Sequence, residues 1–179
     1  MGFCFFSTAA VAALYARTQY RVRRVAVVDF DVHHGNGTQG IFWADPDLFY
    51  GSMHQMPLFP GTGAASERGV GNVWNAPLRA GDGSAAFRAA LGGRILPALD
   101  RFGPELALVS VGFDAHRADP LAGLRPLEPD FARATDRIVD VARRRCGGRV
   151  VSLLEGGYRL DALARSAAAH VGAPMRGAG

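Results

Sequence analysis

The sequence predicts an α/β fold in which helices cover both faces of a mostly parallel sheet. Apolar, β-branched runs alternate with helical patterns along the 179 residues, which is typical of βα units around a parallel sheet. Hydrophobic residues make up 49% of the chain, enough for a sizeable core, and no internal repeat or low-complexity linker divides it. We therefore expect a single three-layer αβα unit over residues 1–179.

The first half of the chain contains two predicted helices and two predicted strands. Ser7 or Thr8 can cap the first helix, which we expect to be buried because the opening of the chain is apolar. The β-branched run after it suits a strand that is covered on both faces. The approximate bounds are residues 8–20 (helix), 24–29 (strand), 38–43 (short helix) and 48–52 (strand). Residues 54–83 are rich in proline and glycine and predict a long, packed, functional loop.

The second half continues the alternation with five more elements. Its predicted elements are residues 84–101 (helix), 105–111 (strand), 129–145 (helix), 149–154 (strand) and 160–170 (helix). Three arginines end the helix at residues 143–145, where they complement the helix dipole and face water, so we assign them no site role.

Composition excludes several classes of function. The net charge is +4 and all 20 basic residues are arginine, but no basic stripe with interleaved aromatic residues points to nucleic acid. Arginine without lysine, beside abundant alanine and glycine, indicates a GC-rich bacterial genome. Arg17 interrupts the apolar opening before it reaches the length of a membrane span, and no basic segment precedes it. Cys4 and Cys146 form no C-x-x-C pair, so we expect a cytoplasmic protein; a homo-oligomer stays open.

Polar residues follow two of the predicted strands at the point where each ends. Asp29, Asp31 and His33 occupy alternate positions, so in an extended chain they project the same way. A later strand ends in Gly112-Phe-Asp114-Ala-His116. Because the carboxyl ends of parallel strands share one edge of a sheet, Asp31, His33 and Asp114 are predicted to converge. Three nitrogen and oxygen ligands with an open fourth position are typical of a catalytic zinc site.

A third strand end adds a candidate hydrogen-bond donor. In Leu154-Glu-Gly-Gly-Tyr158 the glycines allow close approach of the backbone, and the Tyr158 hydroxyl can donate to an oxyanion. Taken alone, an Asp-x-His pattern is usually a turn and a tyrosine after two glycines is usually a packing residue. Burying Asp29 and Asp31 without a cation, however, costs on the order of several kcal/mol, which favours a metal.

Together these residues resemble the histone deacetylase family, in particular its bacterial class II-like members, which are similar to acetylpolyamine amidohydrolases and acetoin-utilisation proteins. The resemblance rests on five strings: Gly2-Phe-Cys4, VDFDVHHGNGT over Val28–Thr38, LFPGTG over Leu58–Gly63, VGFDAHRADPL over Val111–Leu121, and Glu155-Gly-Gly-Tyr158. Their order and spacing follow the family along nearly the whole chain.

The resemblance implies an arginase/deacetylase-like fold and a zinc-dependent hydrolase that removes acetyl groups from acetylated protein lysine or a small acetylated amine. Zinc (Zn²⁺) would bind Asp31, His33 and Asp114, with iron (Fe²⁺) suited to the same donors. Tyr158 would polarise the acetyl carbonyl, and Asp29 matches a carboxylate that orients a catalytic histidine. Two further sets of positions are implied: a substrate tunnel lined by Gly2, Phe3, Phe59, Leu121 and Gly157, and a structural K⁺ or Na⁺ site of Asp29, Asp31, His33 and Ser52.

One part of the family pattern lies outside this sequence. Members carry a His-His pair, the general base and acid, a few residues before the Gly-Phe-Cys motif, and here that motif begins at Gly2. We therefore expect the chain to be the C-terminal part of a single deacetylase domain, incomplete at its N-terminus and poorly active alone, because losing acid–base help costs about 10²- to 10⁴-fold.

Two other readings remain as alternatives. An arginase-like manganese hydrolase needs extra carboxylates at the positions of Gly35 and His116, so its second metal lacks ligands here. A protein that binds metal or acyl-lysine without turnover is not excluded by any residue. Within the deacetylase class, Leu121 replaces an acid found at the tunnel rim of some polyamine-specific members, which favours a neutral acyl substrate.

Overall fold

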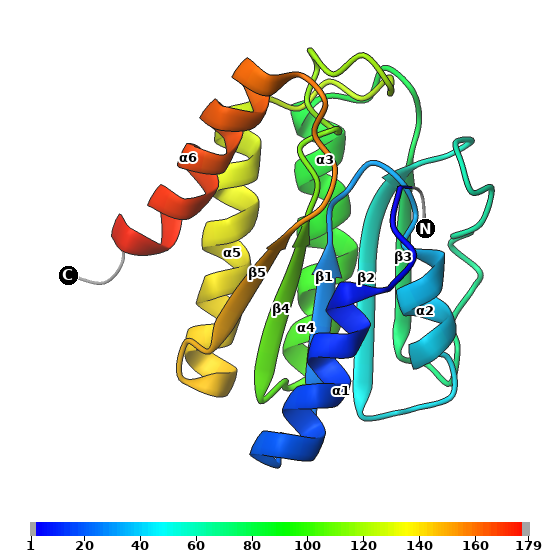
Figure 1. Ribbon diagram of the computed structural model, residues 1–179, viewed down its shortest axis with the longest axis vertical. Coiled ribbons are helices and arrows are strands. Elements are labelled where there is room, and N and C mark those ends of the chain that lie inside the picture. Colours follow the sequence, from blue (N-terminus) through cyan, green and yellow to red (C-terminus); the bar gives the residue numbers. More distant parts are fainter. Residues whose placement is uncertain (1–2, 177–179) are drawn as a thin grey trace.

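The computed structural model describes residues 3–176 of the chain, with the side chains of residues 3–173. Its centre is one sheet of five parallel strands in the order β3-β2-β1-β4-β5 (Figure 1). The strands are β1 (Val25–Asp29), β2 (Leu48–Gln55), β3 (Val73–Leu78), β4 (Leu106–Val111) and β5 (Val150–Leu154). Because all five run the same way, their carboxyl ends share the upper edge of the sheet in Figure 1.

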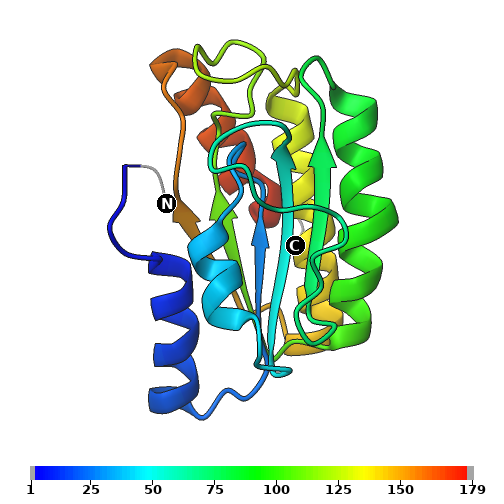
Figure 2. The same ribbon diagram turned by 90° about the vertical axis from the view of Figure 1, so that its right-hand side faces the viewer.

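Helices cover both faces of this sheet, which confirms the predicted three-layer α/β architecture (Figures 1 and 2). One face carries α1 (Thr8–Tyr20) and α2 (Asn36–Phe42). The other carries α3 (Ser84–Ala90), the π-helical turn η1 (Leu91–Ile95), α4 (Leu96–Phe102) and α5 (Glu128–Cys146), with α6 (Leu160–Arg176) packed against α5. The predicted helix over residues 84–101 is thus one continuous helical run with a π turn inside it.

Strand β1 shows how the sequence pattern builds the two cores. Its side chains alternate between the faces, so Val25 and Val27 pack with α1 and α2 while Ala26 and Val28 pack with the opposite helices. All five residues of β1 are buried, as expected for a central parallel strand covered on both sides. The buried strand therefore delivers Asp29, its last residue, directly to the upper edge.

The expectation of a loop throughout residues 54–83 is wrong at two places. Strand β2 continues to Gln55, and β3 pairs in parallel with β2 at the edge of the sheet. Pro77 lies within β3 opposite His54. A proline cannot donate to a ladder, but an edge strand tolerates it because only one side needs pairing. The proline and glycine content around β3 concealed its strand pattern.

Helix α1 is more exposed than predicted. Helix α1 buries only a row of alanines, Ala9, Ala10, Ala13 and Ala16. Its outer side chains Val11 and Tyr15 are more than half exposed, so the expectation of a fully buried helix is wrong for that face. Strand β5 is the other edge of the sheet, and Leu154 at its end is 63% exposed.

Neither cysteine is in a disulfide: Cys4 is exposed and Cys146 is buried, both as free thiols. No helix in the described part of the chain is long and apolar enough to cross a membrane.

Candidate metal centre

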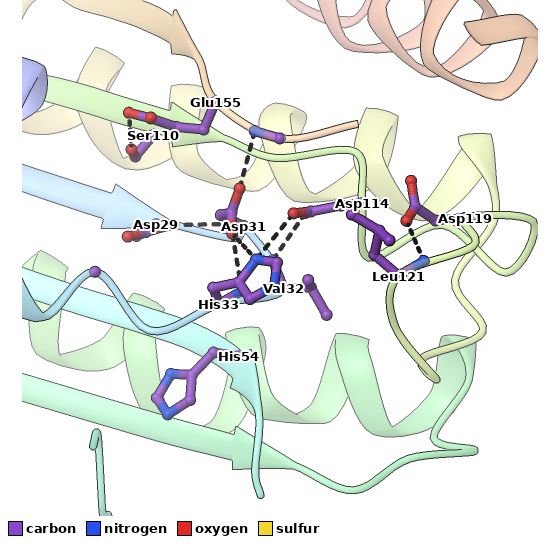
Figure 3. A network of polar contacts seen from close by, with 12 residues as sticks. Asp29, Asp31, Val32, His33, His54, Ser110, Asp114, Asp119, Leu121 and Glu155 are labelled. Carbon is purple, nitrogen blue, oxygen red and sulfur yellow. Dashed lines mark hydrogen bonds and ion pairs between the residues drawn. The ribbon is translucent and has the colours of Figure 1, made fainter. Parts of the chain in front are cut away.

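The predicted ligand row lies where the sequence placed it, just beyond the end of β1. Asp31 and His33 follow the last residue of that strand, and Asp114 follows β4, the neighbouring strand (Figure 3). One donor atom from each of these three side chains lies within 4.8 Å of the other two. Two strand ends thus bring together two carboxylates and an imidazole, as the sequence predicted.

The ligand atoms are held in place by backbone amides. Nδ1 of His33 lies 3.1 Å from Oδ1 of Asp31 and 3.1 Å from Oδ2 of Asp114. The other oxygens of the two carboxylates accept hydrogen bonds, from Gly156 N to Asp31 Oδ2 at 2.9 Å and from Val32 N to Asp114 Oδ1 at 3.0 Å. Each carboxylate therefore keeps one oxygen facing the imidazole and uses the other to fix its orientation.

The electrostatics of the cluster favour a positive charge at its centre. Hydrogen bonds to Asp114 and Asp31 raise the pKa of His33 to about 10, against the desolvation that alone would lower it. Burial, and then the charge of Asp31, raise the pKa of Asp114 to about 6. The two carboxylates that stabilise a proton on this imidazole would stabilise a metal cation in the same place. The donor set and its charge fit a divalent metal ion.

Asp29 lies beneath the triad and is 4% exposed. Its carboxylate accepts the Asp31 amide at 3.0 Å and the Tyr50 hydroxyl at 2.9 Å. Burial, and then the charge of Asp31, hold the pKa of Asp29 well above its usual range. Among the described residues no histidine donates to Asp29. It pairs in register with Ser52 of β2 and Ser110 of β4, so Ser52 is beside it as expected.

Tyr158 lies on the loop that follows β5, two residues after Gly156. A side chain at Gly156 would contact the carboxylates of Asp114 and Asp31, so this loop touches the triad directly. Burial, and then the charges of Asp114 and Asp31, raise the pKa of Tyr158 to about 12. The hydroxyl therefore stays protonated at neutral pH and remains a hydrogen-bond donor.

The residues expected to line a substrate tunnel are only partly brought together. The ring of Phe3 meets that of Tyr158 edge-on at 5.7 Å, and Gly157 precedes Tyr158 with φ +146°. Phe3, Phe59 and Leu121 are 85%, 55% and 48% exposed, so within residues 3–173 these side chains are not enclosed as the walls of a tunnel would be. Gly2 lies outside the described residues.

Sequence reasoning missed a hydrogen-bonded ring that joins the ligand loop to the loop after β2. Oε2 of Glu67 accepts from Gln39 Nε2 at 2.6 Å, and Gln39 Oε1 accepts from His34 Nε2 at 2.9 Å. The Thr62 hydroxyl donates to His34 Nδ1 at 2.7 Å, and Glu67 Oε1 closes the ring by accepting the Gly63 amide. Only the closeness of His34 to a ligand in the sequence could have indicated this ring.

Asp119 was also missed as a site residue, although it lies in one of the family strings. Asp119 is 7% exposed, and its carboxylate accepts the backbone amide of Leu121 (Figure 3) and also that of Tyr158. An aspartate that bonds an amide two residues ahead is typical of a turn, and that local signal hid the second, long-range contact.

The fold and the triad define an α/β protein with a candidate single-metal centre at the carboxyl edge of a parallel sheet. In the described chain the three ligands form the only group of this kind, and Gly35 and His116 add no carboxylate for a second ion. The arginase-like alternative loses support accordingly.

Comparison with known proteins gives the family. The histone deacetylase domain profile matches residues 1–173, and the chain belongs to the histone deacetylase family. It is 49% identical over 172 residues to "Histone deacetylase 10, chloroplastic" of Oryza sativa subsp. japonica, covering 94% of this chain and 39% of that protein. It is 45% identical to the "Histone deacetylase-like amidohydrolase" of Pseudomonas aeruginosa, over 88% of this chain and 43% of that protein.

Solved structures agree. The crystal structure of the HDA15 HD domain matches with a TM-score of 0.89 and 39% identity, over 96% of this chain and 49% of that one. The chain therefore spans about half, or less, of the length of the relatives it matches.

Proposed function

We propose that this chain forms the metal-bearing part of a zinc-dependent deacetylase that hydrolyses acetyl-lysine or a related acetylated amine. The observation that carries the proposal is the convergence of Asp31, His33 and Asp114 within 4.8 Å, in a chain of the histone deacetylase family. The Pseudomonas aeruginosa relative named as an amidohydrolase supports the reaction class. Iron(II) suits the same mixed nitrogen and oxygen donors and is the alternative ion.

The residues of the chain divide the chemistry among them. A bound divalent ion supplies Lewis acidity, polarising the acetyl carbonyl and lowering the pKa of water. Tyr158 donates a hydrogen bond to the carbonyl oxygen, where negative charge develops as water attacks, and its raised pKa keeps the proton available. Asp31 and Asp114 hold His33 between them. The products are acetate and a free amine.

The general base is assigned outside the described residues. Apart from His33, each histidine has its ring nitrogens directed at other partners. Those partners are Thr62 and Gln39 for His34, Ser52 and Gly63 for His54, and Thr135 and Ser152 for His170. For His116, Nδ1 accepts the Ala118 amide, and the buried Nε2 lies 3.5 Å from Glu128 without a hydrogen bond. The proposal therefore takes the base from the His-His pair that the family carries before its Gly-Phe-Cys motif. In this reading the chain is the C-terminal part of one catalytic domain.

The substrate is proposed to reach the metal past an aromatic and apolar rim. Phe3 lies against Tyr158, and we propose that Phe59, Gly157 and Leu121 contribute to the same rim. Leu121 offers no charge to a cationic amine, which favours an acyl-lysine stem, in a protein or a small molecule, over a polyamine.

A monovalent ion is proposed beneath the triad. Asp29 and Ser52 are neighbours across β1 and β2, and Asp31 and His33 follow in the same loop. The Ser52 hydroxyl lies 2.9 Å from Nδ1 of His54, whose Nε2 bonds the carbonyl of Gly63. Ser52 therefore donates to His54, and its oxygen lone pairs stay available to K⁺ or Na⁺ beside the Asp29 carboxylate. We also propose a reducing, cytoplasmic setting, since both cysteines are free.

The test uses the complete gene product that contains these 179 residues, and the 179-residue chain beside it. Zinc content, a fluorogenic acetyl-lysine assay and a chelator control are measured for each, with Asp114→Asn as the ligand variant. One zinc per chain and chelator-sensitive release of acetate support the proposal. Two manganese ions per chain would overturn it. One zinc without turnover in the complete protein would instead favour a binding protein.

A further inference from the structure

Tyr158 lies on a loop whose backbone is poorly restrained by its own sequence. Gly157 immediately before it adopts φ +146°, a conformation open to glycine and rarely to other residues. The side chain of Tyr158 is itself 39% exposed, and the described residue in ring contact with it is Phe3, which is 85% exposed. Neither the glycine nor these ring contacts fix where the hydroxyl points.

The backbone of Tyr158 is held by a hydrogen bond that Asp119 accepts. Oδ2 of Asp119 accepts the Tyr158 backbone amide at 2.8 Å, and Oδ1 accepts the Leu121 amide at 3.0 Å. Asp119 is 7% exposed and forms no ion pair with a described residue, so these two amides are what its carboxylate binds. A carboxylate acceptor makes stronger hydrogen bonds than a neutral group does.

The position of Asp119 in the chain gives this bond its significance. Asp119 lies five residues after the ligand Asp114, at the end of a run of tight turns in which the Asp119 amide donates to the carbonyl of His116 at 2.9 Å. The same loop therefore carries a ligand of the metal centre and the anchor of Tyr158. In the Tyr158 loop, the Gly156 amide donates to Asp31, so this loop is bonded both to one ligand of the metal centre and, through Asp119, to the loop that carries another.

From this geometry we infer that Asp119 is a positioning residue, which sets the Tyr158 hydroxyl against the metal centre and couples it to Leu121 at the substrate rim. The inference rests on the proposed role of Tyr158 and extends it to a residue that touches neither the metal nor the substrate. Asparagine at position 119 keeps one acceptor oxygen but turns an N–H donor towards one of the two amides, so one bond is lost without a change in size.

The experiment is a double-mutant cycle in the complete gene product, with Asp119→Asn, Tyr158→Phe and both together. A displacement of the hydroxyl by about 1 Å predicts a loss in kcat of about 10²-fold for Asp119→Asn, with zinc content and circular dichroism unchanged. Because Asp119 acts through the hydroxyl, the double variant should be no slower than Tyr158→Phe. Asp45→Asn is the control: Asp45 also accepts an amide two residues ahead, that of Asp47, and pairs with Arg17, but at the opposite edge of the sheet.

Three results would overturn the inference while leaving the function standing: an unaltered kcat for Asp119→Asn, losses that multiply in the double variant, or loss of the zinc. An active Tyr158→Phe variant would instead remove the proposed role of Tyr158, and the inference with it. Hydrogen exchange on the unaltered protein gives a check that needs no variant. The Tyr158 amide should be protected although its residue is exposed, and fast exchange there would contradict the bond to Asp119.

Discussion

Replacing Gly156 by alanine tests the candidate metal centre most directly. A Cβ at this position would lie 2.6 Å from Cγ of Asp114 and 2.8 Å from Oδ2 of Asp31, and closer still to Oδ2 of Asp114. Ordinary contacts begin at 3.4 Å, so both carboxylates must move by roughly 1 Å. Gly156 has no positive φ, so alanine meets no backbone strain there and the effect falls on the ligands.

The expected loss follows from that displacement. Removing an outer partner of a metal ligand typically costs 10- to 100-fold in affinity, so displacing two ligands should weaken zinc binding by at least about 100-fold. Overpacking should destabilise the fold by only about 1–3 kcal/mol. Zinc affinity is measured by competition with a chromophoric chelator, and folding by urea denaturation without metal.

Gly40→Ala is the matched control, because a Cβ at Gly40 in α2 meets nothing within 4 Å. Alanine in a helix is favoured over glycine by about 0.5–1 kcal/mol, so this variant should be slightly more stable and bind zinc normally. Gly156→Ala binding zinc with unaltered affinity would refute the placement of the metal between Asp31 and Asp114.

Three further predictions concern stability. Burial, and then the charge of His34, lower the pKa of His54 from 6.5 to about 4. The neutral His54 side chain therefore contributes up to ~3 kcal/mol to the free energy of unfolding above pH 6.5, and this contribution is lost as the pH falls towards 4. Urea unfolding of His54→Gln should show a flatter pH profile across that range, and an unchanged slope would contradict it. Glu67→Gln turns an amide donor towards Gln39 and should lower the free energy of unfolding by about 1–3 kcal/mol. Adding Gln39→Glu should recover most of this loss, and effects of the two substitutions that simply add would argue against the ring. Zinc at about 100 times its Kd should stabilise the chain by about 2.7 kcal/mol and raise its melting temperature. If zinc raised the melting temperature of Asp114→Asn by the same amount, zinc would bind elsewhere.

The sequence predicted those parts of the molecule that repeat a local pattern. The β-branched run at β1 and the alternation of strands and helices were sufficient for the parallel sheet and both helical layers. The ligand row was predictable because side chains alternate along an extended chain, so Asp31 and His33 had to share a side. The approach of Asp114 followed from topology, since β4 lies beside β1.

What the sequence could not predict depends on contacts between distant segments. Strand β3 is stable because it pairs with β2, and its proline and glycine neighbours carry no sign of that pairing. The second oxygen of Asp119 meets Tyr158 across 39 residues, and Gln39 meets Glu67 across 28. No local pattern marks such partners, because any buried acid must find donors and the sequence does not say which.

The acids of this site also bind the loops together, and this bears on how its residues can vary. Asp114, from the loop after β4, accepts the amide of Val32 after β1, while Asp31 accepts the amide of Gly156 after β5. Asp119 then returns from the β4 loop to the β5 loop by accepting the amide of Tyr158. Three loops are thus tied by carboxylates that belong to one loop and bind the backbone of another. A change at Asp31 or Asp114 shifts a ligand and a neighbouring loop together, and a change at Asp119 shifts the Tyr158 loop, so substitutions among these acids should couple rather than add.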